Sequence, residues 1–153
     1  NRLMDAGIVI NGSSENGWNA LHFAVDNDRK GDPLIYPKII SRLLKRGIKI
    51  DGRINSGLTA IHLAVWNDFP EEFKLLIEEG ADINKANNDG WTPLMRAVDG
   101  ENYNMVKDLI AAGAEIPPKN KNGETALVIA RKLNQDKLIV KNIILLLTSS
   151  EKN

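Results

Sequence analysis

Residues 57–64 read Gly-Leu-Thr-Ala-Ile-His-Leu-Ala, and residues 80–84 read Gly-Ala-Asp-Ile-Asn. Both glycines recur along the chain at a constant spacing of 33 residues. One series consists of Gly47, Gly80 and Gly113, and the other of Gly57, Gly90 and Gly123. Two independent glycine series with one period indicate that the chain is built from internal repeats.

The residues around the glycines repeat as well. An isoleucine stands three residues after each glycine of the first series, at Ile50, Ile83 and Ile116. A threonine stands two residues after each glycine of the second series, at Thr59, Thr92 and Thr125. An earlier copy begins at Gly17, 40 residues ahead of Gly57, and therefore carries seven extra residues. We expect this insertion around Asp28 to Pro37, where Leu34, Ile35 and Tyr36 either contact a partner or, as we expect, fold back onto the next helix.

Each copy predicts a turn, a short helix, a short loop and a longer helix. The glycines suit turns that need positive φ or helix ends, and the threonines suit helix starts. Apolar residues spaced as in Phe73, Leu76 and Ile77 predict the longer helices. One helix pair cannot bury its apolar face alone, so neighbouring copies must stack to form the core.

These residues closely resemble the ankyrin repeat, whose pattern runs G-x-T-P-L-H-x-A and later G-A-D-x-N. The resemblance implies an all-α solenoid of stacked antiparallel helix pairs, with projecting turns or short β-hairpins and with the first helices on the concave side. Met95 and Val128 depart from it by replacing the histidine, and Pro117-Pro118 by replacing hairpin residues. It divides one domain into a partial repeat at 1–13, full repeats at 14–53, 54–86 and 87–119, and a C-terminal capping repeat at 120–153.

Composition argues against several other classes of protein. The net charge is zero, which argues against a nucleic-acid binder, because such proteins need a concentrated basic surface. The absence of cysteine excludes disulfides, thiolate nucleophiles and zinc–thiolate sites, and fits a cytoplasmic location. The most apolar stretch, Leu138 to Leu147, is too short to insert across a membrane.

No catalytic or cofactor-binding motif is present, so we expect neither an enzyme nor a cofactor. His22 and His62 occupy equivalent positions in neighbouring repeats. A metal pair is one interpretation, but no further ligand shares the periodicity. We therefore expect structural histidines that bond to nearby backbone or threonine.

The resemblance implies that variable positions at the hairpin tips and along the concave side bind another protein. All three tryptophans fall in this variable set, and tryptophan is common at binding hot spots. The alternative is that they pack between neighbouring hairpins and stiffen the stack. The candidate partner-binding residues are Trp18, Asp26, Leu58, Trp66, Asn67, Asp89, Trp91, Asp99 and Glu101.

Charge is unevenly distributed along the chain. Residues 54–116 carry four basic and eleven acidic side chains, a net charge of −7, whereas residues 1–53 carry +3 and residues 117–153 carry +4. We expect a partner that offers a basic or mixed segment with an apolar anchor. The alternative is a solvated acidic face that keeps the protein soluble.

The leading hypothesis is therefore a protein–protein interaction module, monomeric by itself. A second hypothesis is a regulatory or substrate-recruiting segment of a larger enzyme, channel or host-directed effector, which would act in the host cytosol. The chain does not begin with Met, which favours this second hypothesis. A third is an assembly element that dimerises through the apolar last helix. Asn84 stands where asparagine hydroxylation is known in the family that the chain resembles.

Overall fold

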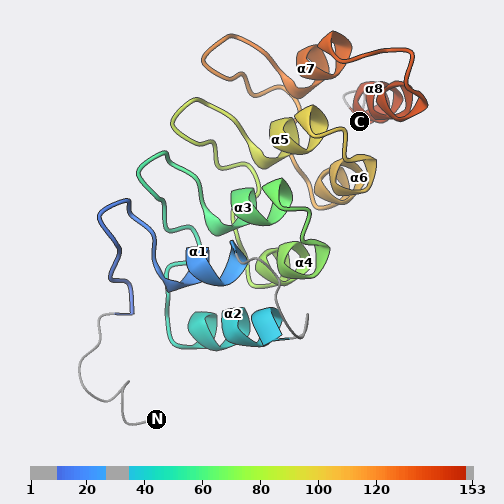
Figure 1. Ribbon diagram of the computed structural model, residues 1–153. Helices are drawn as coiled ribbons and strands as arrows, with labels where there is room; N and C mark the ends of the chain where they lie inside the picture. The colour runs from blue at the N-terminus through green and yellow to red at the C-terminus, as the bar shows by residue number, and fades with distance from the viewer. Residues whose placement is uncertain (1–9, 27–34, 151–153) are drawn as a thin grey trace.

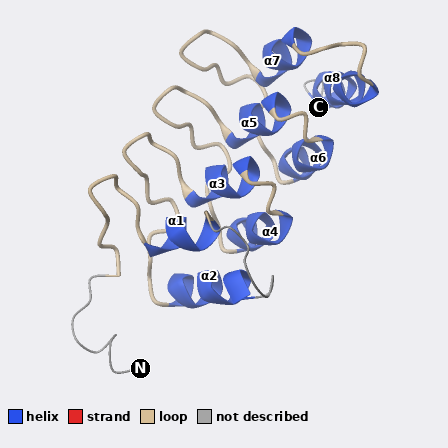
Figure 2. Ribbon diagram, viewed as in Figure 1, coloured by secondary structure: helices blue, strands red, loops and turns tan. Residues whose placement is uncertain are grey.

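The computed structural model describes residues 10–26 and 35–150. This part of the chain forms eight helices and no strand (Figure 2), which confirms the all-α prediction and makes the projecting loops turns rather than β-hairpins. The helices, in chain order, are α1 (Ala20–Val25), α2 (Ile35–Lys45), α3 (Ala60–Trp66), α4 (Pro70–Glu78), α5 (Pro93–Asp99), α6 (Tyr103–Ala111), α7 (Ala126–Lys132) and α8 (Leu138–Ser150).

The helices stack as antiparallel pairs in two rows (Figure 1). The short first helices α1, α3, α5 and α7 contact one another in succession, and each packs against its own longer second helix. The long loops between successive pairs all project to the same side of the stack. The molecule is therefore a helical solenoid, as the repeat predicted.

Each projecting loop contains the same tight turn, shortly before the next first helix. In the second full repeat, the Gly57 N–H donates to the Ile54 carbonyl at 2.8 Å, and the Ile54 N–H donates to the Leu58 carbonyl at 3.0 Å. Gly57 has a φ of +85°, and a Cβ there would lie 2.3 Å from the Asn88 side-chain oxygen of the next loop. Gly17, Gly57 and Gly90 are therefore required both by backbone conformation and by the close approach of the next loop, whereas at Gly123 the positive φ alone favours glycine.

One continuous core runs along the stack from Leu21 to Leu147. The alanines Ala64, Ala97 and Ala130 of the first helices are almost completely buried, and their small side chains let neighbouring first helices approach closely. Phe73, Leu76 and their counterparts on the other second helices fill the space between the rows. The core is thus shared between repeats, as expected for units that cannot fold alone.

The predicted insertion needs a correction. Ile35, Tyr36 and Pro37 do not belong to a loop that folds back onto the second helix, because they form the first turn of α2 itself. Helix α2 begins 12 residues before Gly47, whereas α4 and α6 begin 10 residues before Gly80 and Gly113. Part of the insertion thus lengthens a helix, and its remaining residues, 28–34, lie outside the described residues.

A candidate protein-binding surface

The first helices and the projecting loops present one row of side chains along the stack, which we call the inner row. Each full repeat contributes two members to it. One directly follows the glycine of the tight turn (Gly17, Gly57, Gly90 or Gly123), and the other lies nine residues after that glycine. From the first full repeat to the last, they are Trp18 and Asp26, Leu58 and Trp66, Trp91 and Asp99, and Glu124 and Lys132.

Trp66 is the most exposed apolar side chain of the inner row, because 55% of it is exposed at the end of α3. The guanidinium of Arg96, on the neighbouring helix α5, lies over its indole ring, with the Arg96 Cζ 3.4 Å from the ring centroid. Arg96 also donates to the Asp99 carboxylate at 2.9 Å. A cation–π contact and an ion pair therefore hold Trp66 in a defined position while leaving much of the ring exposed.

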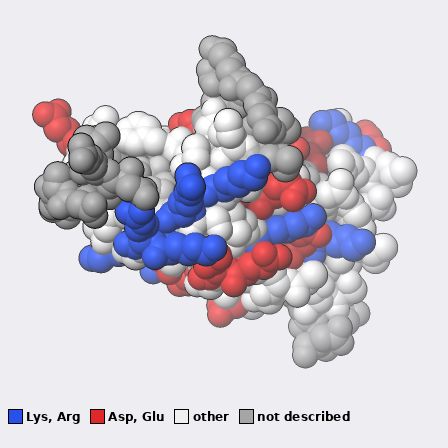
Figure 3. Space-filling model, turned by 90° about the horizontal axis from the view of Figure 1, so that it is seen from below, with Lys and Arg blue, Asp and Glu red and all other residues white. Residues whose placement is uncertain are grey.

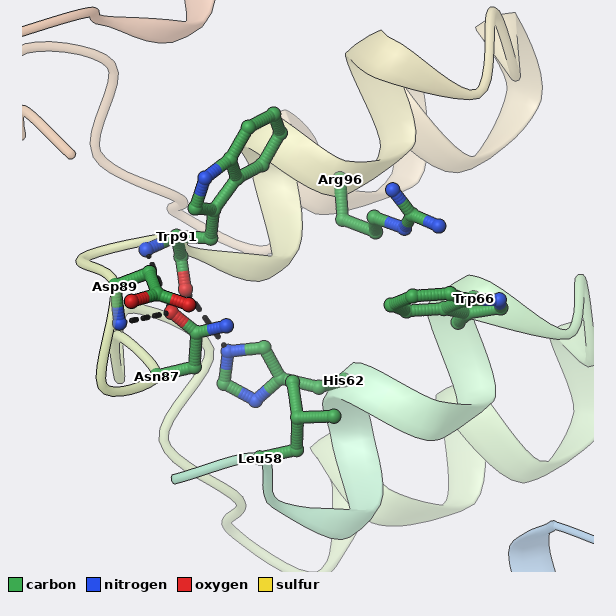
Figure 4. Close-up of a pocket in the computed structure, with 7 residues that line it drawn as sticks. All are labelled: Leu58, His62, Trp66, Asn87, Asp89, Trp91 and Arg96. Carbon is green, nitrogen blue, oxygen red and sulfur yellow. Dashed lines mark hydrogen bonds between the residues drawn. The ribbon is translucent and has the colours of Figure 1, made fainter. Parts of the chain in front are cut away.

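A pocket of about 170 Å³ lies beside this stacked pair (Figure 4). The α3 repeat supplies Leu58, His62 and Trp66, and the next repeat supplies Asn87, Asp89, Trp91 and Arg96. Four predicted residues, Leu58, Trp66, Asp89 and Trp91, thus meet in one pocket between two repeats. Asp99 lies behind Arg96 and lines a second hollow on the other side of the stacked pair.

The back of the pocket is fixed by buried hydrogen bonds. The His62 Nε2–H donates to the Trp91 carbonyl at 3.2 Å, and His62 Nδ1 accepts from the Thr59 hydroxyl at 2.9 Å and from the Thr59 N–H at 3.2 Å. Asn87 accepts from the Trp91 N–H at 2.9 Å. These contacts confirm the structural role predicted for this histidine, and His22 bonds in the same way to the Asn19 N–H and the Gly52 carbonyl.

The same environment keeps His62 neutral. Burial lowers its pKa to about 4. The hydrogen bond to the Trp91 carbonyl acts in the opposite direction and raises the pKa, but its effect is smaller. The nearby Arg53 lowers the pKa further, and Asp82 raises it. At neutral pH the pocket is therefore lined by an uncharged imidazole with both nitrogens occupied.

Trp18 lies apart from this pocket, in the first full repeat. Its ring lies 5.2 Å from that of Phe23 and 6.0 Å from that of His22, measured between ring centroids. Trp18 is half-buried, whereas Phe23 is 59% exposed. Together they extend the apolar part of the inner surface towards the first repeat.

The other three predicted residues join neighbouring repeats. Asn67 donates to the Asp26 carboxylate at 2.9 Å, and Lys137 donates to the Glu101 carboxylate at 2.8 Å. Between them, Asn102 donates to Asp68 at 2.7 Å. In each of the first three full repeats, an acidic side chain after the first helix thus accepts from the repeat that follows. Asp26, Asn67 and Glu101 therefore have a structural role in the stack.

The inner row changes character in the last repeat. Glu124 and Lys132 form an ion pair there, in place of the large apolar side chains of the earlier repeats. The hydrogen bond from Asn120, followed by the one from Lys132, lowers the pKa of Glu124. The apolar part of the surface therefore spans the first three full repeats and ends at a charged pair.

Sequence reasoning missed Arg96 and Phe23. Both stand six residues after a turn glycine, where Leu63 and Ile129 are buried in the other two repeats. At this position the other repeats carry core residues, so the arginine and the phenylalanine could have been recognised from the sequence as candidate surface residues. The contact of Arg96 with Trp66 could not be predicted from the sequence, because it depends on how two side chains of different repeats are oriented.

Other kinds of site receive no support from the part of the chain that the structure describes. No group of three or more His, Asp or Glu side chains within residues 10–26 and 35–150 could hold a metal ion. Over the same residues, every helix is too short or too polar to cross a lipid bilayer.

Two comparisons with known proteins bear on this surface. A search of curated proteins finds no match to the chain. The family model for ankyrin repeats, three copies, matches residues 36–120, which is more than half of the chain and includes the pocket. The chain therefore belongs to the ankyrin repeat family.

Proposed function

We propose that this chain binds a partner protein through its inner surface, with an apolar side chain of the partner seated in the pocket between Trp66 and Trp91. Ankyrin repeats are generally non-catalytic modules for protein–protein interaction. The observation that carries the more specific proposal is Trp66, a large side chain that is 55% exposed and yet held in place by Arg96. Burying a pre-positioned tryptophan gains contact area and costs little side-chain entropy.

The dimensions and charge of the pocket support a particular kind of partner segment. A volume of about 170 Å³ accepts one side chain of the size of leucine. Asp89 is exposed at the edge of the pocket, and Asp99 stands behind Arg96. A partner segment with an apolar side chain next to a basic residue fits this arrangement. The apolar side chain would be buried in the pocket while the basic residue approaches Asp89 or Asp99.

A random peptide library displayed on phage, selected against the whole chain, provides probes for this surface. We expect the selected peptides to lose at least about tenfold in affinity on Trp66→Ala, because truncating a central hot-spot residue costs 2 kcal/mol or more. The matched control is Leu145→Ala, which removes an exposed apolar side chain from α8, outside the inner row. Equal affinities of the two variants for the peptides would refute the proposed site.

The acidic side chains are tested by charge reversal. Asp99→Lys should weaken binding of a basic selected peptide by slowing association, whereas Glu78→Lys, at an exposed position on α4, should not. Raising the salt concentration from about 0.05 to 0.5 M should weaken binding to the wild type, because the Debye length shortens. An affinity that does not change with salt would remove charge steering from the proposal but leave the apolar anchor in place.

A further inference from the structure

Helix α2 presents a second surface, at the opposite end of the stack from α8 (Figure 1). The segment from Ile35 to Ile50 contains five basic residues and no acidic one. All five are exposed, and they are Lys38, Arg42, Lys45, Arg46 and Lys49. We infer that this face of α2 docks an acidic, partly apolar segment of a partner protein, independently of the inner row.

Among residues 10–26 and 35–150, no acidic side chain neutralises these five cations. No ion pair joins any of them to a carboxylate of the described residues, whereas Lys85, Arg96, Lys121, Lys132 and Lys137 each pair with one. Lys38, Arg42 and Lys45 lie one turn apart along one side of the helix and span about 10 Å. A ligand with several carboxylates could therefore engage several of these cations at once.

Helix stability does not account for the whole cluster. Cations in the last turn of a helix interact favourably with its unpaired carbonyl groups, which explains Arg42 and Lys45 but not Arg46 and Lys49, which follow the helix. Lys38 lies near the start of α2, where a positive charge opposes the helix dipole. Binding an anionic ligand is a role that would account for all five side chains.

Two isoleucines add an apolar component to this surface. Ile35 and Ile39 lie one turn apart on α2 and are 47% and 42% exposed. Ile40, by contrast, is completely buried on the opposite side of the helix. The exposed face thus passes from apolar at its start to basic at its end, which matches a segment that carries an apolar residue next to several carboxylates.

The neighbouring helix favours a narrow protein segment over an anionic membrane. Helix α4 packs against α2 and exposes Glu71, Glu78 and the adjoining Glu79. The face seen in Figure 3 accordingly carries a cluster of basic side chains beside a band of acidic ones. A flat anionic bilayer laid over both helices would be repelled by the acidic band, whereas a peptide can lie along α2 alone.

The test uses a fluorescein-labelled, glutamate-rich peptide with two leucines near one end, titrated with the whole chain and followed by fluorescence anisotropy. The variant Arg42→Gln/Lys45→Gln/Arg46→Gln removes three positive charges from the end of α2 and the residue that follows it. The control Lys107→Gln/Lys119→Gln/Lys141→Gln removes three exposed positive charges elsewhere, so both proteins have the same net charge. We expect the α2 variant to weaken binding at least about tenfold, and the control less than about threefold.

Two further measurements distinguish loss of the basic surface from misfolding and from a general effect of net charge. Arg42→Lys/Arg46→Lys keeps the charge and should bind the peptide within about threefold of wild type, which distinguishes a charge requirement from a folding defect. Equal weakening by the two glutamine variants would overturn the inference, because it would show an effect of net charge alone. It would also be overturned if the peptide failed to bind while phosphatidylserine-containing vesicles bound in an α2-dependent manner.

Discussion

Trp66 and Arg96 come from successive repeats and restrict each other's motion. The guanidinium covers one part of the indole ring and is itself restrained by Asp99. A long, flexible arginine and a large exposed ring would each lose entropy on binding a partner if they were free. Their contact in the free protein would remove part of that loss for a partner bound at the proposed site.

His62 makes the stability of the protein depend on pH. Its pKa is about 4 in the folded chain and 6.5 in the unfolded chain, so between these values only the unfolded chain takes up the proton. The contribution of His62 to the free energy of unfolding should be constant above pH 6.5 and fall by about 3 kcal/mol as the pH approaches 4. His22, whose pKa burial also lowers, acts in the same direction.

Urea unfolding measured from pH 7.5 to 4.5 checks this prediction. His62→Met introduces the residue found at the equivalent position of the next repeat, Met95. The variant should be less stable at pH 7, because the Trp91 carbonyl loses its donor, and its stability should depend less on pH than that of the wild type. An unchanged pH dependence would show that His62 does not keep the low pKa.

Two glycines with positive φ, one from each glycine series, give a second prediction at the residue scale. Gly57 and Gly80 have nearly the same φ, +85° and +86°, but only at Gly57 would a Cβ collide with the next loop. Gly80→Ala should lower the free energy of unfolding by about 1 kcal/mol, the cost of the left-handed backbone. Gly57→Ala should lower it by at least about twice as much, as measured by urea denaturation. Equal losses would mean that the successive loops can move apart.

At the scale of elements, a hydrogen bond repeated along the stack connects each repeat to the next. Asn11 accepts from the Lys49 N–H at 2.7 Å, Asp51 from the Asp82 N–H at 3.0 Å, and Asn84 from the Glu115 N–H at 2.8 Å. The three acceptors lie four residues after Gly7, Gly47 and Gly80, respectively. Pro117 occupies this position in the next repeat and offers no side-chain acceptor, so the pattern ends there.

Removing one of these acceptors should weaken the boundary between two repeats. Asn84→Ala leaves the Glu115 N–H without its partner and should cost about 0.5–1.5 kcal/mol of stability, since the bond is exposed and water can replace the acceptor. Amide hydrogen exchange at Glu115 should also become faster. Asn104→Ala, at an exposed position on α6, is the control and should change stability by less than about 0.5 kcal/mol. Unchanged exchange at Glu115 would show that this bond is not what orders the boundary.

The framework of these elements could be predicted from the sequence, because each repeat imposes the same requirements at the same positions. Gly57, Thr59 and Ala64 recur since every copy needs a tight turn, a helix start and a close helix contact. The site was predicted only in part. Trp66 and Trp91 were found as variable aromatic residues, but their meeting with Arg96 in one pocket depends on side-chain orientation. The inter-repeat bonds of Asp26, Asn67 and Glu101 were missed for the same reason.

At the scale of the whole molecule, the chain presents two surfaces of different chemistry. The inner surface combines tryptophans with acidic side chains, whereas α2 combines isoleucines with basic ones. Zero net charge conceals this division, because the basic and acidic parts occupy different repeats. A net charge near zero therefore does not describe what either surface would attract.

We expect the isolated protein to be a monomer despite the exposed Leu138 and Leu145 on α8. These side chains are flanked by the exposed polar residues Lys141 and Asn142, which limits the size of the apolar patch. Sedimentation velocity at increasing concentration should give the mass of one chain, 16.9 kDa, throughout. A dimer that dissociates on Leu138→Glu/Leu145→Glu would instead identify α8 as an assembly surface.

The inner surface is tested most directly by the indole N–H resonances of the three tryptophans, Trp18, Trp66 and Trp91, in a ¹⁵N-labelled sample. Each resonance is assigned by a Trp→Phe variant, and a library-selected peptide is then titrated in. We predict that the Trp66 and Trp91 resonances shift in proportion to the bound fraction. A saturated complex that leaves both resonances in place, while amide resonances of α2 or α8 shift, would contradict the proposed site.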